Sequence, residues 1–349
     1  MHRRFVMRCQ IRVAIRSAAV ATGCLSLLCA GATAAHATFP GRDGLIAFAS
    51  SQDSQVTIST MRADGSQRTL ITRRLISRSP AWSADGAWIV YTASGRHFPE
   101  ELFIMRADGT GVRRLTTDDE PQAWPTWSPT GKRIAFVFVG RRFNYRIATI
   151  GVDGKDRHVL TPHRSDAADP DWSPDGTRIA FDANGQIATM GPRGGSVQIV
   201  TTEGGFDPSW SPNGRWIAYE SDGDLYRIRD DGSGLQRLTA TGIEEHSPSW
   251  SPSGGRIVYL RTRSNDERPS YLAAIWTIAA DGSDPRRVLR RVSDEMLPFE
   301  APAWQPRGAQ NGEAVTPRGG RAGGRALPPR RLTRPAATPV SAGDRSIRT

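Results

Sequence analysis

The phrase PDWSPDGTRIAF at residues 170–181 decides the fold, because close copies of it recur along the chain. The other full copies are PAWSADGAWIVY (80–91), PTWSPTGKRIAF (125–136), PSWSPNGRWIAY (208–219) and PSWSPSGGRIVY (248–259). The second half alone opens the series as GRDGLIAF at 41–48, and the first half alone closes it as PAWQP at 302–306. Self-similarity with a period of about 40 residues is typical of a fold that repeats one supersecondary unit.

Each repeat predicts four short antiparallel strands. The Pro-x-Trp segment forms the first strand, with its proline at the strand start, where the missing N–H costs least. Ser-Pro-Asp-Gly then makes a tight turn into a second strand that contains Ile-Ala-Phe. A third strand such as 102–105 leads through an Asp-Gly turn, as in MRADG at 105–109, to a fourth strand that ends in Arg-Leu-Thr.

Six such units predict an all-β fold, a six-bladed β-propeller of four-stranded antiparallel blades. If the Pro-x-Trp strand is innermost, the half repeats at the two ends of the series complete one blade. N- and C-terminal strands that share a blade would close the ring and leave no open blade edge. The expected blades are 44–72 with 301–305, 80–116, 125–161, 170–201, 208–239 and 248–290.

The recurring phrase resembles the WD-like propeller repeat of the TolB type. It is also similar to repeats in the propeller domains of prolyl oligopeptidases and in some bacterial polysaccharide lyases. The resemblance covers residues 41–306 and implies an exported six-bladed propeller that binds partner proteins in the periplasm. TolB proteins carry an α/β domain before the propeller. Because the repeats here begin close to an expected cleavage site, we expect this chain to lack that domain.

The first 37 residues predict a cleaved export signal. Residues 1–37 contain no acid and five arginines, all within residues 3–16. The arginine-rich start is followed by the apolar run SAAVATGCLSLLCAG at 17–31. Ala35 and Ala37 have the spacing of an A-x-A cleavage site. The apolar run is shorter than the roughly 18 residues of a membrane-spanning helix. We therefore expect a mature protein from residue 38 that is periplasmic or extracellular and has no membrane span.

Two further features of this segment bear on the mature protein. All three cysteines, Cys9, Cys24 and Cys29, lie within the signal, so the mature chain has no disulfide and no thiol chemistry. The pair Arg3 and Arg4 leaves general and twin-arginine export both open.

The net charge of +11 is concentrated at the two ends of the chain. Residues 1–37 carry +5 and residues 307–349 carry +7, and subtracting both from +11 leaves −1 for residues 38–306. The segment 307–349 is rich in Pro, Gly and Arg and has no aromatic residue, which predicts a disordered tail. It is either a solvated tail or a weak contact to an anionic surface, and we do not expect sequence-specific nucleic-acid binding.

The recurring residues are interpreted as structural. A tryptophan at one position of every blade favours packing between blades over sugar stacking; these are Trp82, Trp127, Trp172, Trp210, Trp250 and Trp304. The Asp-Gly pairs lack the dense acidic pattern of a calcium loop, so we interpret them as turns. The histidines after residue 37 show no metal-ligand spacing. We therefore predict no cofactor, no metal and no catalytic residue.

The best candidate site lies where loops run into the innermost strands, at one mouth of the central channel. These loops are 116–125, 161–170, 201–208, 239–248 and 291–302, and all of them are acidic. The alternative is ordinary solvated loop charge. From these loops we select five residues as ligand-binding: Asp169, Asp207, Glu245, His246 and Glu300. Clustered carboxylates at a channel mouth focus a field that attracts a protein, a peptide or a cation.

Two functions are consistent with this pattern. The first is a monomeric, non-catalytic module that binds a protein or peptide in the cell envelope. The second is a propeller enzyme, polysaccharide lyase-like or hydrolase-associated, with its site at the channel mouth. A lyase needs a positioned base and a group that neutralises a carboxylate. Clustering of His163 or His246 with several acids favours the enzyme, whereas dispersed histidines favour the binding module.

Overall fold

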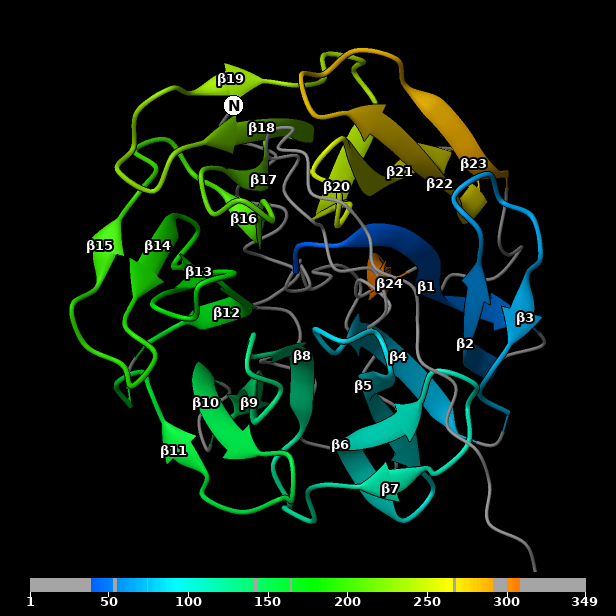
Figure 1. Ribbon diagram of the computed structural model, residues 1–349, viewed down its shortest axis with the longest axis vertical. Helices are drawn as coiled ribbons and strands as arrows, with labels where there is room; N and C mark the ends of the chain where they lie inside the picture. The colour runs from blue at the N-terminus through cyan, green and yellow to red at the C-terminus, as the bar shows by residue number, and fades with distance from the viewer. Residues whose placement is uncertain are drawn as a thin grey trace, which may run out of the picture. The chain divides into compact units, whose positions relative to one another are not determined.

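The computed structural model describes residues 39–52, 55–73, 75–140, 144–163, 165–265, 268–290 and 300–307. These residues form six four-stranded antiparallel sheets that stand as blades around a ring (Figure 1). The predicted all-β, six-bladed propeller is thereby confirmed. No helix in the described ranges is long and apolar enough to cross a membrane. The expected signal at 1–37 and, apart from Arg307, the expected tail lie outside the described residues.

The strands are numbered in chain order, and each blade is described from its inner to its outer strand. Blade 1 contains β24 (Glu300–Arg307), β1 (Arg42–Gln52), β2 (Gln55–Met61) and β3 (Thr69–Leu70); blade 2 contains β4 (Ile76–Trp82), β5 (Trp88–Gly95), β6 (Phe98–Arg106) and β7 (Arg113–Arg114); blade 3 contains β8 (Gln122–Trp127), β9 (Arg133–Val139), β10 (Tyr145–Gly151) and β11 (His158–Val159). Blade 4 contains β12 (Ala167–Trp172), β13 (Ile179–Ala183), β14 (Ile187–Met190) and β15 (Gln198–Ile199); blade 5 contains β16 (Phe206–Trp210), β17 (Ile217–Ser221), β18 (Asp224–Ile228) and β19 (Gln236–Arg237); blade 6 contains β20 (Glu244–Trp250), β21 (Arg256–Asn265), β22 (Arg268–Ala279) and β23 (Arg286–Arg290).

The Pro-x-Trp strands are innermost. Figure 1 shows β4, β8, β12, β16, β20 and β24 nearest the centre of the ring, and the last strand of each blade at its rim. Each innermost strand contacts the innermost strand of the next blade, and the series is closed by the contact between β24 and β4. The central channel is therefore bounded by one repeated segment.

Strands from the two ends of the repeat series share blade 1, as predicted. β24 pairs antiparallel with β1, with Trp304 opposite Ile46. Gln305 joins this blade to blade 2, because its Oε1 accepts the N–H of Leu45 at 3.1 Å and its Nε2 donates to the carbonyl of Gly86 at 2.8 Å. One amide side chain thus ties β24 to its own blade and to the next.

The other side of blade 1 is fixed to blade 6. Asp43 accepts the backbone N–H of Ser253 with Oδ1 at 2.9 Å and the Ser253 hydroxyl with Oδ2 at 3.0 Å. The N–H of Gly41 donates to the carbonyl of Pro252 at 3.2 Å. Blade 1 is held by polar contacts on both sides, so the ring does not depend on the strand pairing of β24 alone.

The fourth strands are shorter than the sequence predicts. In blades 1 to 5 they have two residues, and the threonine of the Arg-Leu-Thr segment lies beyond them. Its hydroxyl instead accepts the backbone N–H of the third strand at 2.8–3.0 Å, in the pairs Thr72 and Ile58, Thr116 and Leu102, Thr161 and Ile147, Thr201 and Ile187, and Thr239 and Leu225. A buried N–H left without an acceptor is costly, which explains why threonine recurs at this position.

The Asp-Gly turns bring each blade against the preceding one. Gly109 has a φ of +83°, and a Cβ at this position would lie 2.8 Å from the carbonyl oxygen of Ile71 in blade 1. The same contact crosses the closure of the ring, where Gly65 lies against the carbonyl of Val288. Only glycine combines this conformation with so close an approach of two backbones.

The six recurring tryptophans lie in the blade core, each at most 4% exposed. The indole of Trp82 donates to the carbonyl of Ala303 at 3.2 Å, and that of Trp127 donates to the carbonyl of Ala81 at 3.1 Å. Both bonds run from one innermost strand to the innermost strand of the preceding blade. Large buried aromatic side chains at these positions pack the blades together.

Candidate functional site

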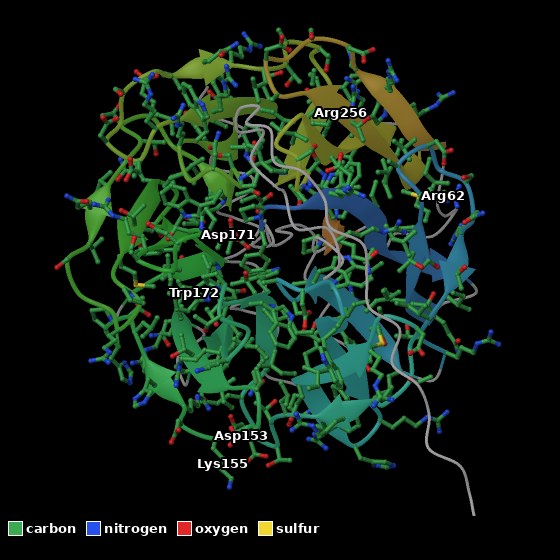
Figure 2. The ribbon with its side chains drawn as sticks, viewed as in Figure 1. Arg62, Asp153, Lys155, Asp171, Trp172 and Arg256 are labelled. Carbon is green, nitrogen blue, oxygen red and sulfur yellow. The ribbon has the colours of Figure 1, made fainter. Side chains whose placement is uncertain are left out.

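We call the end of the ring where loops run into the innermost strands the channel mouth. The turns between second and third strands lie at this end, because strand direction alternates within each antiparallel blade. The Ser-Pro-Asp-Gly and Asp-Gly turns lie at the opposite face. Figure 2 shows Asp171 near the centre of the ring, whereas Asp153 and Lys155 lie at the outer edge of blade 3.

A β-bulge interrupts the innermost strand of each blade just before its proline. The register with the second strand shifts there, for example between Ala168 and Asp171 in blade 4. The bulge residue has a left-handed conformation, with φ between 47° and 57°, in five described blades: Ser79, Trp124, Asp169, Asp207 and Ser247. Bulges redirect side chains and are conspicuous next to functional sites. Two of the predicted site residues, Asp169 and Asp207, occupy this position.

The structure brings Asp207 and His246 together through Ser247. Asp207 Oδ2 accepts the backbone N–H of Ser247 at 3.2 Å and its hydroxyl at 3.3 Å. The Ser247 hydroxyl lies 2.9 Å from His246 Nδ1. Serine therefore stands between aspartate and histidine, whereas a nucleophilic triad places histidine between the other two. All three side chains are at most 9% exposed, so this network joins blade 5 to blade 6 inside the protein.

Glu245 lies on the same strand and points to a different set of partners. Its carboxylate is fully buried and forms an ion pair with Arg261, whose Nε donates to Oε1 at 2.8 Å. The Arg261 guanidinium stacks on the ring of Trp276, 4.0 Å from the centroid. Burial raises the pKa of neighbouring Tyr259 to about 12. Glu245 is thus part of the packing of blade 6, and a ligand reaches it only after displacing Arg261.

Asp171 is a buried carboxyl group that sequence reasoning did not single out as a site residue. It lies in the Pro-x-Trp segment of β12, and its Oδ2 accepts the backbone N–H of Trp210 in β16 at 2.6 Å. Burial raises its pKa well above the ordinary value, against the lowering effect of this hydrogen bond. The other blades have Ala, Thr or Ser at this position, so a single charged residue in a small-residue column was the available signal.

Glu300, expected in the loop before the innermost strand, is the first residue of β24, and its side chain lies outside the described part of the molecule. The preceding segment 291–299 also lies outside the described residues. His163 is exposed on the loop into β12, where its carbonyl accepts from Asn144. Among the described residues, no three His, Cys, Asp or Glu side chains gather closely enough to hold a metal ion.

The exposed carboxylates at the mouth come from loops and turns. Glu203, Asp222 and Glu244 are exposed, and none of the three forms a side-chain hydrogen bond or ion pair within the described residues. Glu203 and Glu244 belong to the predicted acidic loops, whereas Asp222 lies in a turn between second and third strands. Burial raises the pKa of Tyr226, and nearby Asp222 and Glu203 raise it further. These acids therefore share one patch over blades 5 and 6.

Backbone hydrogen bonds fasten the mouth loops of blades 4 to 6 to one another. The N–H of Asn184 donates to the carbonyl of Asp166 at 3.0 Å, and that of Gly205 to the carbonyl of Gly185 at 2.9 Å. The Ser221 hydroxyl donates to the carbonyl of Glu203 at 3.3 Å. The N–H of Glu245 donates to the carbonyl of Gly223 at 2.8 Å. This series of bonds, which we call the mouth belt, supports the exposed carboxylates on an ordered floor.

Two of the three acids of the loop into blade 3 share one arginine. Arg157 forms ion pairs with Asp118 and with Glu120, the latter at 2.9 Å. Its guanidinium lies 4.4 Å from the ring centroid of Phe138. An open hollow of about 560 Å³ lies against Asp118, Asp119, Glu120 and Arg157. The predicted acidic ring is therefore uneven: among the described residues, Asp118 and Glu120 at blade 3 share an arginine, whereas the exposed acids at blades 5 and 6 have no ion-pair partner.

The sequence model of the TolB beta propeller domain matches residues 19–181 and 144–308. These matches together cover more than half of the chain. The chain belongs to the TolB β-propeller domain family. No curated protein is significantly similar to it in sequence.

Solved structures show the same propeller fold. TolB from Acinetobacter baumannii has a TM-score of 0.64 at 22% identity, over 75% of this chain and 67% of that one. A putative TolB from Agrobacterium tumefaciens has a TM-score of 0.56 at 18% identity, over 76% and 99%. Kuenenia stuttgartiensis hydrazine synthase has a TM-score of 0.60 at 15% identity, over 78% and 48%. Since one fold serves such different proteins, the function of this TolB-type propeller has to be argued from its own surface.

Proposed function

We propose that this TolB-type propeller is exported and binds a protein or peptide at its channel mouth in the cell envelope, without catalysing a reaction there. The observation that carries the proposal is the patch of Glu203, Asp222 and Glu244. These exposed carboxylates have no ion-pair partner among the described residues, whereas Asp118 and Glu120 over blade 3 are paired with Arg157. Unpaired charge of one sign favours encounter with a partner of the opposite sign.

The mouth belt supports a binding role. Because its loops are already fastened by three backbone hydrogen bonds and by the Ser221 hydroxyl, little conformational entropy is lost when a partner binds to them. The buried histidine supports a role without chemistry. A general base has to reach the proton that it removes, and His246 is 9% exposed with Nδ1 next to Ser247.

The envelope location rests on residues 1–37 and on the likeness to TolB proteins. We propose cleavage after Ala37. The N-terminal sequence of protein isolated from the envelope or the medium is then expected to start at Thr38, and an N-terminus at Met1 would contradict export. The basic segment 307–349 is proposed as a weak tether to an anionic surface. Truncation after residue 306 should then abolish a salt-sensitive association with the envelope.

The binding proposal is tested with matched charge variants. In the mouth variant, Glu203→Gln, Asp222→Asn and Glu244→Gln remove three charges. In the control, Asp64→Asn, Asp108→Asn and Asp231→Asn remove three charges from turns at the opposite face, where Asn keeps the Oδ1 acceptor of each turn. Tagged full chains are used to capture partners from envelope extract. Loss of capture in the mouth variant alone supports the proposal, and equal capture by both variants contradicts it.

A further inference from the structure

Blade 6 rises above its neighbours at the channel mouth. Its second strand, β21, continues for six residues past Tyr259 to Asn265, whereas β17 of blade 5 ends two residues past the equivalent Tyr219. Four additional residues extend the strand by about 13 Å. The tip of blade 6 therefore stands beside the low floor of blade 5, on which Asp222 lies.

The innermost strand does not follow β21 to this height. β20 begins at Glu244, which pairs with Thr262, and the preceding residue Ile243 lies in a bend. Beyond Thr262, β21 pairs only with β22 in the described part of the chain. Within the described residues, the inner edge of β21 from Arg263 to Asn265, which faces the channel mouth, therefore has no paired strand. In blades 2 to 5 the second strand ends within one residue of its last innermost partner. In blade 1, β1 continues from Ala49, the partner of Glu300, to Gln52, but this blade lies farther from Asp222.

The backbone of Ser264 points into this edge. Successive residues of an antiparallel ladder direct their N–H and C=O groups alternately to the two sides. Glu245 donates its N–H to Gly223 and not to β21, so the pair of Glu245 and Arg261 is not hydrogen-bonded. The backbone N–H and C=O groups of Thr262 therefore point to β20, those of Arg263 point to β22, and those of Ser264 point to the inner side again. One N–H and one C=O are presented above the start of β20.

In the β21–β22 hairpin, the outer strand β22 is less suited to pairing with a further strand. β22 carries Pro269 at this height, and proline has no N–H to donate. Proline is a common protection of a strand edge against further pairing. The inner edge of β21 has no such protection, since Arg263, Ser264 and Asn265 all have an N–H.

We propose that a partner segment in extended conformation adds as a strand to the inner edge of β21 at Ser264, continuing the line of β20 over the channel mouth, and that this segment is basic. A strand in this position lies above Glu244, and the loop that carries Asp222 is next to it, since a Cβ at Gly223 would lie 3.7 Å from the Glu244 Cα. Strand addition supplies affinity through the backbone, and side chains along the added strand supply specificity. Lysine and arginine on the added strand match the unpaired carboxylates below it.

This inference rests on the proposed function and specifies the partner at the same mouth. The test uses random dodecapeptides displayed on phage, selected on the full exported chain, and titrated as synthetic peptides against variants. Ser264→Pro removes the inward N–H, and Ser264→Ala is its matched control because it keeps the N–H. Neither substitution alters a bond within the β21–β22 ladder, and equal thermal unfolding of the two variants verifies that the fold is retained.

The expected result is a set of selected peptides rich in Lys and Arg with β-forming residues between them. Ser264→Pro removes one backbone hydrogen bond and leaves a carbonyl of the peptide without its donor, which should weaken binding by about tenfold, with Ser264→Ala like wild type. Peptides that lose affinity for the mouth variant but bind both Ser264 variants equally would overturn strand addition and leave the proposed function standing. Peptides insensitive to the mouth variant would overturn both.

Discussion

Asp171 in β12 and Trp210 in β16 are joined by a hydrogen bond of 2.6 Å from the tryptophan backbone N–H to the carboxyl Oδ2. The bond links the innermost strands of blades 4 and 5 at a fully buried point. Blades 5 and 6 are linked in a similar way by Asp207 and Ser247. Blades 1, 2 and 3 are instead linked by neutral indole-to-carbonyl bonds of Trp82 and Trp127. Among these links between innermost strands, the two that contain a carboxyl group lie in blades 4 to 6, which also carry the exposed carboxylates of the candidate site.

The first prediction concerns the pH dependence of stability. Burial raises the pKa of Asp171 in the folded protein, so folding is penalised once the unfolded carboxyl has lost its proton. Stability should fall as pH rises from about 4, the unfolded pKa, through the folded pKa, with about 1.4 kcal/mol for each unit that separates them.

Asp171→Asn isolates this effect, because the amide oxygen still accepts the Trp210 N–H. The stability of the variant relative to the wild type should increase as pH rises from about 4 to about 8. Midpoints of thermal unfolding, measured across this range for both proteins, provide the check. Parallel curves for the two proteins would show that the pKa of Asp171 is the same in the folded and the unfolded state, and would contradict the prediction.

The second prediction compares the stability cost of Gly→Ala at two turn glycines, only one of which lies close to the backbone of another blade. Gly109 and Gly131 have φ values of +83° and +67°. A Cβ at Gly109 would lie 2.8 Å from the carbonyl oxygen of Ile71, whereas a Cβ at Gly131 would meet no atom within 4 Å. Gly131→Ala should cost about 1–2 kcal/mol for the left-handed conformation. Gly109→Ala should cost a further 1–3 kcal/mol, roughly, because the contact between blades has to widen. Urea unfolding of both variants measures the difference, and equal losses would refute the contact.

The third prediction concerns the recurring threonine. The Thr239 hydroxyl accepts the N–H of Leu225 at 2.9 Å. Thr239→Val removes this acceptor with little change in shape and should cost about 1–3 kcal/mol, because a buried N–H is left without a partner. Thr239→Ser keeps the hydroxyl and should retain most of the stability. Chemical denaturation of the two variants decides, and similar losses for valine and serine would point to side-chain packing as the cause.

The fourth prediction concerns ring closure. Gln305→Met keeps the length of the side chain but leaves the Leu45 N–H and the Gly86 carbonyl without their partner. The expected loss is about 1–3 kcal/mol. Gln55→Met, at an exposed position in β2, is the control and should stay within about 0.5 kcal/mol of wild type. A Gln305 variant as stable as the control would mean that strand pairing alone holds β24.

The fold was predictable because its determinants are local and repeated. Pro-x-Trp, the Ser-Pro-Asp-Gly turn and the Asp-Gly turn recur in phase, and the half repeats at 41–48 and 302–306 predict the shared blade. The threonine at the end of each repeat was visible as well. Its bond to the third strand was not, because hydrogen bonds from a loop residue to a strand depend on tertiary geometry.

The candidate site was less predictable, because a loop sequence reveals charge but not burial. Asp169, Asp207 and Glu245 lie in acidic loop segments of the sequence, yet all three are at most 3% exposed in the structure. The bulge before each proline and the ion pair with Arg261 account for the burial of Asp207 and Glu245. Asp222 went unnoticed because it belongs to a turn and not to a loop that runs into an innermost strand.

Binding at the channel mouth is tested most directly by backbone hydrogen–deuterium exchange in the full chain, with and without a partner captured by the wild type and lost by the mouth variant. We expect the partner to slow exchange in the mouth segments 201–206, 221–224 and 239–245. Exchange in the turns at the opposite face, such as 62–66 and 106–110, should stay unchanged. Slowed exchange in those turns, with the mouth segments unaffected, would contradict binding at the channel mouth.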